Sequence, residues 1–274
     1  MRSSLPLLAL LVVQPLAGQS SWSRVVDLDL YGMVAPAGLQ AISAYSFRKV
    51  LAGPGVDPLA YMQGGVIASC SPAFGYAGLV VEVQPAPFLV LRAEHEATRF
   101  FGQWGALLSL PTAMAPFGDA DLKARNGQEE SASGVRTVIQ ATPQARLGQV
   151  VLRHQATFSW LHFGGRGPWF YDCENDTLLR GDDRIQDQQT FALWESNWGS
   201  LKSYCGATWQ VTTAHASGLT RRRLGAVVSF EASSTWGRWG RPRGGLIVGQ
   251  NQSDPNRKGE LYGSASLGTT WTLP

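Results

Sequence analysis

The chain has 274 residues and a net charge of +3, which is too small to indicate a nucleic-acid-binding protein. Charged residues make up 16% of the chain, against roughly 25% in an average soluble domain, while hydrophobic residues make up an ordinary 44%. Together with 31 Gly and 10 Trp residues, this composition indicates apolar surface spread over many half-buried strands, in one large β domain or two smaller ones.

Residues 1–20 are predicted to form a cleavable secretory signal peptide. Arg2 and the α-amino group are positive, residues 5–16 are apolar, and small residues follow at 17–20. A buried N-terminal helix or strand is the alternative. Beyond residue 20 no apolar run reaches the ~18 residues that a membrane-spanning helix needs, so a membrane protein with this sequence must be a barrel. We therefore expect a signal peptide at 1–20 and a single domain at 21–274.

The remaining sequence alternates apolar with small or polar residues in segments of about ten, separated by turn residues. Successive side chains of a strand point to opposite faces, so this alternation predicts β-strands. Twelve strands are predicted, at 25–34, 38–50, 60–71, 75–84, 87–100, 134–143, 146–162, 187–199, 202–214, 220–234, 243–251 and 258–272. In the last strand one face is polar, and the other carries Leu261, Gly263, Ala265, Leu267, Thr269, Trp271 and Leu273.

The lengths of the connections fit an even number of strands. When the predicted strands are counted along the chain, the three short breaks fall at one end of the barrel, at 84–87, 142–145 and 198–200. The two long polar stretches fall at the other end, at 101–133 and 163–186. Bacterial barrels have short turns in the periplasm and long loops outside, so both ends of the domain are predicted to be periplasmic. The segment 169–174 is assigned to a loop, because one more strand would make the number odd.

The leader, the strand rhythm and the final strand resemble those of bacterial outer-membrane β-barrels of the porin-like kind. The resemblance implies an all-β, antiparallel transmembrane barrel of about 12 strands in the bacterial outer membrane. It also implies contact with outer-membrane lipids and lipopolysaccharide, and insertion by the barrel-assembly machinery. Members of the family usually end in Phe or Trp, and here Trp271 and Leu273 would serve, because Pro274 is the last residue.

The polar phase of two similar strands supplies the candidate lumen residues Arg92, Glu94, Glu96 and Arg153. Charges of both signs on the wall of a water-filled passage would select ions or small solutes, which makes a passive pore the first functional hypothesis. The alternative is a structural barrel plugged by its own ion pairs, since roughly eight to twelve strands leave a bore that side chains nearly fill. The 101–133 loop could fold inward and narrow the bore further. No cofactor and no metal site are expected.

A basic cluster opens the strand at 220–234, at the predicted outer rim. Arg221 and Arg222 are candidates for contact with lipopolysaccharide phosphates, and a solvated loop cluster is the alternative.

Two other classes of protein stay open as alternatives. His215 and Ser217 resemble the His-x-Ser pair of outer-membrane lipid acyl hydrolases, in which the histidine activates the serine. Glu231, the nearest later acid, would lie over about 20 Å from His215 on the hairpin, at ~3.3 Å per residue. A secreted, soluble β-sandwich binding protein would also explain the strands and Trp residues, but it would usually carry more surface charge.

Overall fold

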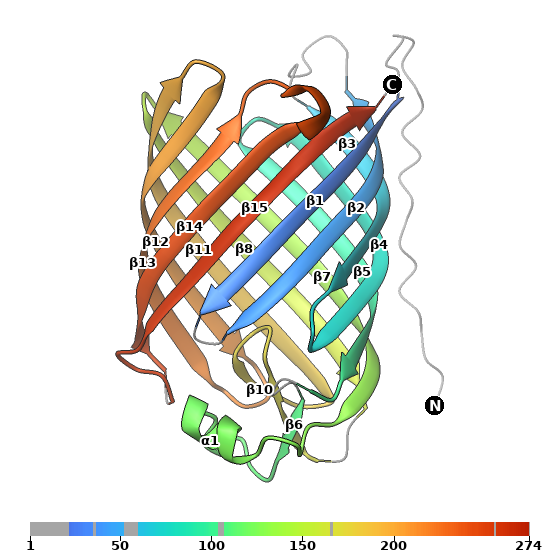
Figure 1. The fold of residues 1–274 in the computed structure, drawn as a ribbon, viewed down its shortest axis with the longest axis vertical. Coiled ribbons are helices and arrows are strands. Elements are labelled where there is room, and N and C mark those ends of the chain that lie inside the picture. The colour runs from blue at the N-terminus through green and yellow to red at the C-terminus, as the bar shows by residue number, and fades with distance from the viewer. Residues whose placement is uncertain are drawn as a thin grey trace.

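Twelve long strands pair side by side and close on themselves in a computed structural model that describes residues 22–34, 37–51, 60–103, 107–164, 167–254 and 256–273. The order around the barrel is β1-β15-β14-β13-β12-β11-β8-β7-β5-β4-β3-β2, and every neighbouring pair is antiparallel (Figure 1). The all-β barrel with 12 strands is therefore confirmed. The predicted signal peptide at 1–20 lies outside the described residues.

The barrel strands are β1 (Trp22–Val34), β2 (Gly38–Val50), β3 (Tyr61–Cys70), β4 (Phe74–Ala86), β5 (Leu89–Phe101), β7 (Ser131–Leu147), β8 (Val150–Phe163), β11 (Asp182–Trp198), β12 (Leu201–Ala214), β13 (Thr220–Ala232), β14 (Arg241–Ser253) and β15 (Leu261–Leu273). The remaining elements are short. They are β6 (Leu108–Leu110), α1 (Asp119–Ala124), β9 (Trp169–Asp172), β10 (Thr177–Leu179) and the 3-10 turn η1 (Gly237–Trp239).

One predicted turn is displaced along the chain. The turn predicted at 142–145 lies inside β7, and the chain reverses at Gly148 and Gln149 instead. Gly148 has φ +62, a left-handed conformation that glycine adopts without steric cost and that suits a two-residue hairpin turn. Pro143 is tolerated because it lies opposite Leu89, the first residue of β5, where the ladder ends and a missing N–H costs little.

The segment assigned to a loop at 169–174 contains a strand, and that part of the prediction is wrong. Trp169–Asp172 forms β9, which pairs with β10 and β6 in a separate three-stranded sheet. The number of barrel strands stays at twelve because β9 belongs to the connection between β8 and β11. All four residues of β9 are buried, so tertiary packing stabilises this strand and its sequence shows no alternation of buried and exposed residues.

The two ends of the barrel differ strongly. At the end that we call the short-turn end, close connections join β4 to β5, β7 to β8 and β11 to β12. At the opposite end, β6, α1, β9 and β10 form a cap, made of residues 107–130 and 167–181, which lies across the barrel mouth (Figure 1, lower end). The two longest connections therefore lie at the end opposite the three short turns, as the sequence predicted, although the capped end also has short turns, such as those between β3 and β4 and between β12 and β13.

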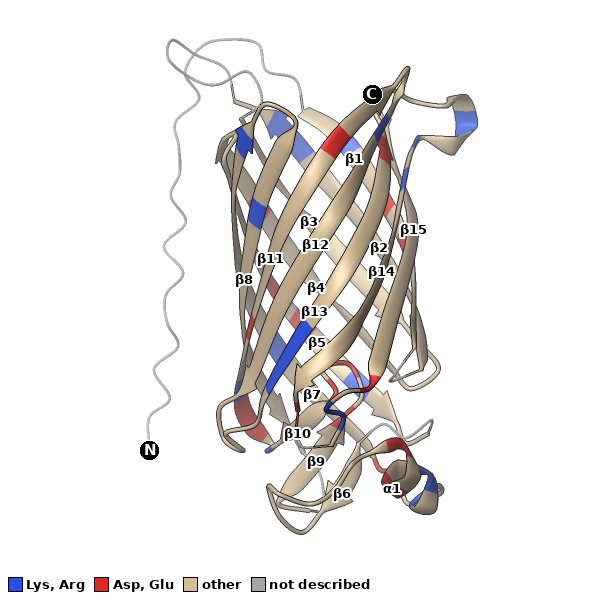
Figure 2. Ribbon diagram, turned by 90° about the vertical axis from the view of Figure 1, so that its left-hand side faces the viewer, with Lys and Arg blue, Asp and Glu red and all other residues tan. Residues whose placement is uncertain are grey.

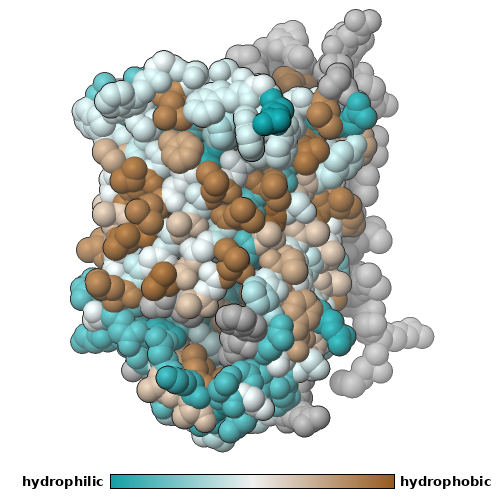
Figure 3. Space-filling view, in the orientation of Figure 1, coloured by the Kyte–Doolittle hydropathy of each residue, from teal (hydrophilic) through white to brown (hydrophobic). Residues whose placement is uncertain are grey.

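The outward faces of the strands form an apolar belt. Large exposed hydrophobic side chains recur at every second position, for example Leu79 and Val81 on β4, or Leu246 and Val248 on β14. Figure 3 shows apolar side chains across the middle of one face and hydrophilic residues over the cap. On β15 the alternation is as predicted, with Leu261 and Leu267 exposed outside. Such a belt around a closed barrel matches a hydrocarbon surrounding.

Two histidines lie on the same outward phase as the belt. His95 on β5 is hydrogen-bonded through Nδ1 to the Thr137 hydroxyl at 2.9 Å, and His154 on β8 is bonded in the same way to Thr190 at 2.9 Å. A threonine on the neighbouring strand thus satisfies one polar ring atom of each histidine, which reduces the cost of an imidazole in an apolar setting.

The belt gives a direct test of membrane insertion. Leu79→Arg places a charge midway along β4, where it should lower the free energy of unfolding by roughly 2–4 kcal/mol, whereas Leu147→Arg at the short-turn rim should cost about 0–1 kcal/mol. Denaturant titration of both variants in lipid bilayers measures the difference. Equal costs at the two positions would contradict a belt that faces hydrocarbon.

Candidate functional site: the lumen and its cap

Charged residues of both signs are spread along the strands of the barrel (Figure 2), and several of them form ion pairs inside it. Arg92, one of the predicted lumen residues, points inward from β5. Its Nε donates to Glu94 Oε1 at 2.5 Å and its Nη1 lies 3.2 Å from Glu82 Oε2 on β4. Tyr61 Oη donates to the other oxygen of Glu82 at 2.6 Å. One arginine and one tyrosine hydroxyl thus hold two carboxylates of this part of the wall in a single network.

Glu96, another predicted lumen residue, connects the wall with the cap. Its carboxylate is fully buried and accepts a bond from Arg136 Nε on β7 at 2.7 Å. Arg136 Nη1 also reaches Glu174 Oε2 at 2.7 Å, at the tip of the β9–β10 hairpin, and its guanidinium lies 4.6 Å from the ring centre of Tyr76. One arginine therefore ties the barrel wall to the cap by charge-assisted bonds.

Asp176, on the same hairpin tip, is the centre of a second and larger cluster. Its carboxylate is 1% exposed and lies 3.1 Å from Arg221, 3.3 Å from Arg223 and 2.9 Å from Arg257. The Tyr171 hydroxyl donates to it at 2.9 Å. Asp176 has φ +48, a left-handed conformation that Asp and Asn tolerate better than most residues. We call this group of three arginines around Asp176 the aspartate latch.

Arg257 joins the aspartate latch to the rest of the cap. It is the largest fully buried side chain, and its Nη1 also bonds Asp119 at the start of α1 at 2.6 Å. Glu260 lies 3.3 Å from the same nitrogen. Burial alone would lower the pKa of the Arg257 guanidinium, but Asp176 and Asp119 raise it above its usual value. Arg257 is therefore a permanent cation that holds three parts of the chain together.

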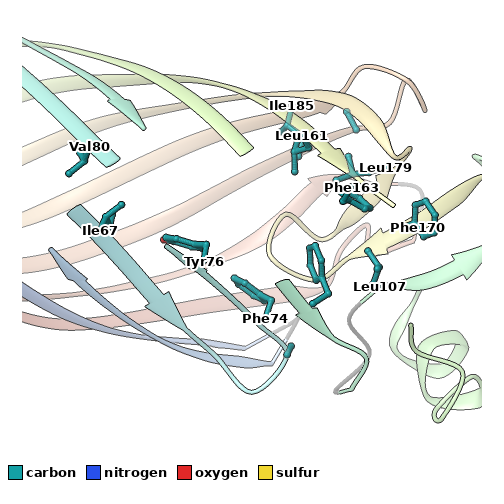
Figure 4. Packing of buried hydrophobic residues seen from close by; sticks show 13 residues of the cluster. Ile67, Phe74, Tyr76, Val80, Leu107, Leu161, Phe163, Phe170, Leu179 and Ile185 are labelled. Atoms are coloured by element: carbon teal, nitrogen blue, oxygen red, sulfur yellow. The ribbon is translucent and has the colours of Figure 1, made fainter. Parts of the chain in front are cut away.

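Apolar packing closes the capped end beside these ion pairs. Phe74, Phe100 and Phe163 from the barrel walls meet Phe170 and Leu107 from the cap (Figure 4). Ring centres lie 5.6 Å apart for Phe100 and Phe163 and 5.5 Å apart for Phe163 and Phe170. A second cluster inside the cap includes Leu108, Phe117, Trp169, Tyr171 and Leu178. The cap is thus anchored to the barrel by a continuous hydrophobic core as well as by charge.

The other half of the lumen is a chamber of about 970 Å³ that reaches the short-turn end. Its rim includes Pro87, Phe88 and Arg146, and its inner wall includes Tyr31 and Tyr204. Arg153, the fourth predicted lumen residue, lines this chamber. The structure thus places all four predicted lumen residues inside the barrel, three of them in the ion-paired wall and one in the open chamber. Their role in conduction stays a prediction.

Arg221 and Arg222 occupy different surroundings. Arg221 is 8% exposed and belongs to the aspartate latch, so it does not face the outer surface as predicted. Successive residues of a strand point to opposite faces, and Arg222 is therefore the exposed member. Contact with lipopolysaccharide stays a prediction for Arg222 alone.

Sequence reasoning did not find the cap contacts. Asp176, Arg257 and Arg136 were not singled out, although all three are buried or half-buried charged residues. Their positions gave no signal, since Asp176 lies in the long connection between β8 and β11 and Arg257 in the turn between β14 and β15, where a charge is normally solvated. Ion pairs between residues that are far apart in the sequence follow no local sequence pattern.

The two residues of the hydrolase alternative lie in the turn between β12 and β13. The Ser217 hydroxyl lies 3.5 Å from the Ala214 carbonyl and accepts from the Leu219 amide at 3.4 Å. No hydrogen bond joins His215 to Ser217 in the part of the chain that the structure describes. Glu231 lies on β13 beside the short-turn end, opposite Lys202, so it is at the far end of the barrel from His215.

Within the described ranges, no group of three or more His, Cys, Asp and Glu side chains could hold a metal ion. The same residues contain no helix that is long and apolar enough to cross a membrane, a finding that does not bear on crossing by strands.

A closed antiparallel barrel with an apolar outer belt and a charged interior is the fold of outer-membrane β-barrels, and this chain has that fold. No protein-family model matches the chain, and no curated protein matches its sequence. Solved structures that it resembles are bacterial outer-membrane β-barrels.

One of these structures is the beta domain of the Bordetella autotransporter BrkA, with 11% identity, a TM-score of 0.45, and coverage of 90% of this chain and 97% of that one. The transport unit of the autotransporter AIDA-I from Escherichia coli matches with 9% identity and a TM-score of 0.45 over 95% and 93% of the two chains. LpxR from Salmonella typhimurium matches with 8% identity and a TM-score of 0.40 over 89% and 99%. The strand pairing itself establishes the barrel, and these distant likenesses assign no function.

The aspartate latch should control the stability of the cap. Asp176→Asn keeps the side-chain shape and the tolerance for a left-handed backbone but leaves three arginines without their shared anion, which should cost about 3–5 kcal/mol of cap stability. Hydrogen exchange of the β9–β10 amides measures the loss. Asp119→Ala is the matched control, because Asp119 also bonds Arg257 but is 71% exposed, and its loss should cost far less. Similar exchange in the two variants would contradict a central role for Asp176.

Asp172 should make cap stability depend on pH. Burial, together with the nearby negative charge of Glu174, raises the pKa of Asp172 to about 6 from its ordinary value of 3.8. The folded cap then binds the proton more tightly than the unfolded chain, so this stabilisation is fully present below about pH 4 and is lost as the pH rises through about 6. Proteolysis of the cap between pH 4 and pH 7 should become faster as the pH rises. Asp172→Asn should flatten this profile, and an unchanged profile would assign the pH dependence to another group.

Proposed function

We propose that this protein is a structural membrane protein of the bacterial outer membrane, a barrel closed at one end rather than an enzyme or an open pore. The observation that carries the proposal is the cap. Its hairpin tip bonds β7 through Glu174 and β13 through Asp176, so it reaches across the inside of the barrel mouth. The phenylalanine cluster fills the space beside it. Solutes and ions would therefore meet a packed core at that end.

The direction of insertion follows from the connections. Short turns of bacterial barrels lie in the periplasm and long loops outside, so the cap would face the exterior and the 970 Å³ chamber would open to the periplasm. The apolar belt would contact lipid. Arg222, which points outward near the capped end, would then lie at the level of the lipopolysaccharide phosphates. Insertion of the barrel would proceed through the barrel-assembly machinery.

A passive pore is the second candidate function, and the charged chamber favours it. If the cap moved aside, the lumen would offer a wall with charges of both signs from Arg92, Glu94 and Arg153, which suits selection among ions and small solutes. The two candidates differ in one measurable property, the conductance of the folded protein.

Planar-bilayer recording separates the two functions. The wild-type protein should give no conductance steps, whereas Asp176→Asn, by loosening the cap, should give intermittent openings, and Asp119→Ala should stay silent like the wild type. Migration of unboiled against boiled protein in SDS shows that each variant still forms the closed barrel. Steady conductance of the wild-type protein would overturn the closed-barrel proposal. In that event Arg92→Ala and Glu94→Ala should alter ion selectivity.

A further inference from the structure

The acidic residues of the chamber are already engaged by arginines. Asp29 Oδ2 lies 2.7 Å from Arg243, and Glu195 Oε1 lies 2.5 Å from Arg146. Glu231, at the rim, lies 3.2 Å from Arg241. Each carboxylate that lines the chamber is thus neutralised by a guanidinium, so the chamber offers no free anion to attract a cation.

Arg153 is the exception among the chamber's arginines. It projects from β8 into the chamber and stays exposed there, and in the described residues it has no ion pair and no side-chain hydrogen bond. Its register partners are Phe191 on β11 and Gln144 on β7, neither of which is charged. Lys202 also lines the chamber without an ion pair, but Glu231 lies directly opposite it on β13. Arg153 is therefore the arginine of the chamber wall that makes no direct ion pair among the described residues, although the negative charges of Glu231 and Glu82 still act on it through space.

An apolar frame surrounds this charge. Phe191 is paired directly opposite Arg153, and Leu193 is paired directly opposite Val151, two residues before Arg153 in β8. All three hydrophobic side chains share the inward phase with Arg153 and line the chamber. A porin-like water path would not need hydrophobic side chains around a free guanidinium, whereas a binding site for an amphipathic anion would.

We propose that the chamber binds a small organic carboxylate with an apolar body, which Arg153 anchors. The planar guanidinium would hold the carboxylate by two parallel hydrogen bonds, as arginine does with such groups. Phe191, Leu193 and Val151 would contact the apolar body. A volume of about 970 Å³ lies within the range of small-molecule pockets, which run from about 300 to 1,000 Å³. Because the chamber reaches the short-turn rim, the ligand enters from that end.

This inference goes beyond the closed barrel, since it assigns a ligand and does not depend on whether the cap ever opens. Calorimetric titration of the full-length protein in nonionic detergent tests it, with 3-phenylpropionate as the probe. Wild-type protein should bind the probe. Arg153→Ala and Arg153→Gln should each weaken binding at least roughly tenfold, a loss of about 1.4 kcal/mol. Arg238→Ala is the matched control, because Arg238 lies in the η1 turn and does not line the chamber, so the loss of its charge should leave binding unchanged.

Two further probes separate the charge from the apolar frame. 3-Phenylpropionamide keeps the body and lacks the charge, so equal binding of the amide would mean partition into detergent or apolar surface and would overturn the proposal. Inorganic phosphate keeps the charge and lacks the body, so phosphate binding as tight as that of the carboxylate would overturn the role of Phe191 and Leu193. Binding that survives both Arg153 variants would overturn the anchor. These experiments measure binding and not conductance. A negative result would therefore refute the ligand proposal without affecting the conductance test of the closed barrel.

Discussion

The pairing of β1 with β15 is the contact on which the rest of the structure depends. Eleven residue pairs, from Arg24 opposite Leu273 to Val34 opposite Gly263, join the first strand to the last and leave the sheet without an edge. In hydrocarbon an unpaired backbone N–H or C=O costs several kcal/mol, so only closure makes a sheet compatible with a membrane. Once the ring is closed, the two-residue period of every strand fixes which side chains meet lipid and which meet the lumen.

Because the lumen is narrow, charged side chains inside it are partly desolvated and form ion pairs with one another. At the capped end the partners come from different parts of the chain, as when Asp176 on the cap hairpin binds arginines of β13 and of the turn before β15. At the short-turn end the pairs form within the wall, as between Arg146 and Glu195. The same electrostatic requirement thus produces a sealed half and an open half, and in the open half Arg153 makes no direct ion pair among the described residues.

Local pattern predicted the barrel well because strand alternation is a local property. The strand from 38 to 50 has the predicted bounds, and the inward placement of Arg92, Glu94 and Glu96 follows from phase alone. The pattern failed where local rules are overridden. Pro143 does not end β7, because the neighbouring strand has already ended there, and the short strand β9 is buried on all sides and shows no alternation.

By itself the sequence determined the strands, their two faces, the even number and the side on which long connections gather, since each of these depends on residues within a few positions of one another. Only the tertiary structure decided that two connections form a cap, that Arg221 lies inside rather than at the surface, and that Arg153 faces an apolar frame. These depend on contacts between residues far apart in sequence, with separations of 47 for Arg223 and Asp176 and 81 for Arg257 and Asp176. Closing the barrel brings such residues together, and no pattern within a single strand encodes which of them will meet.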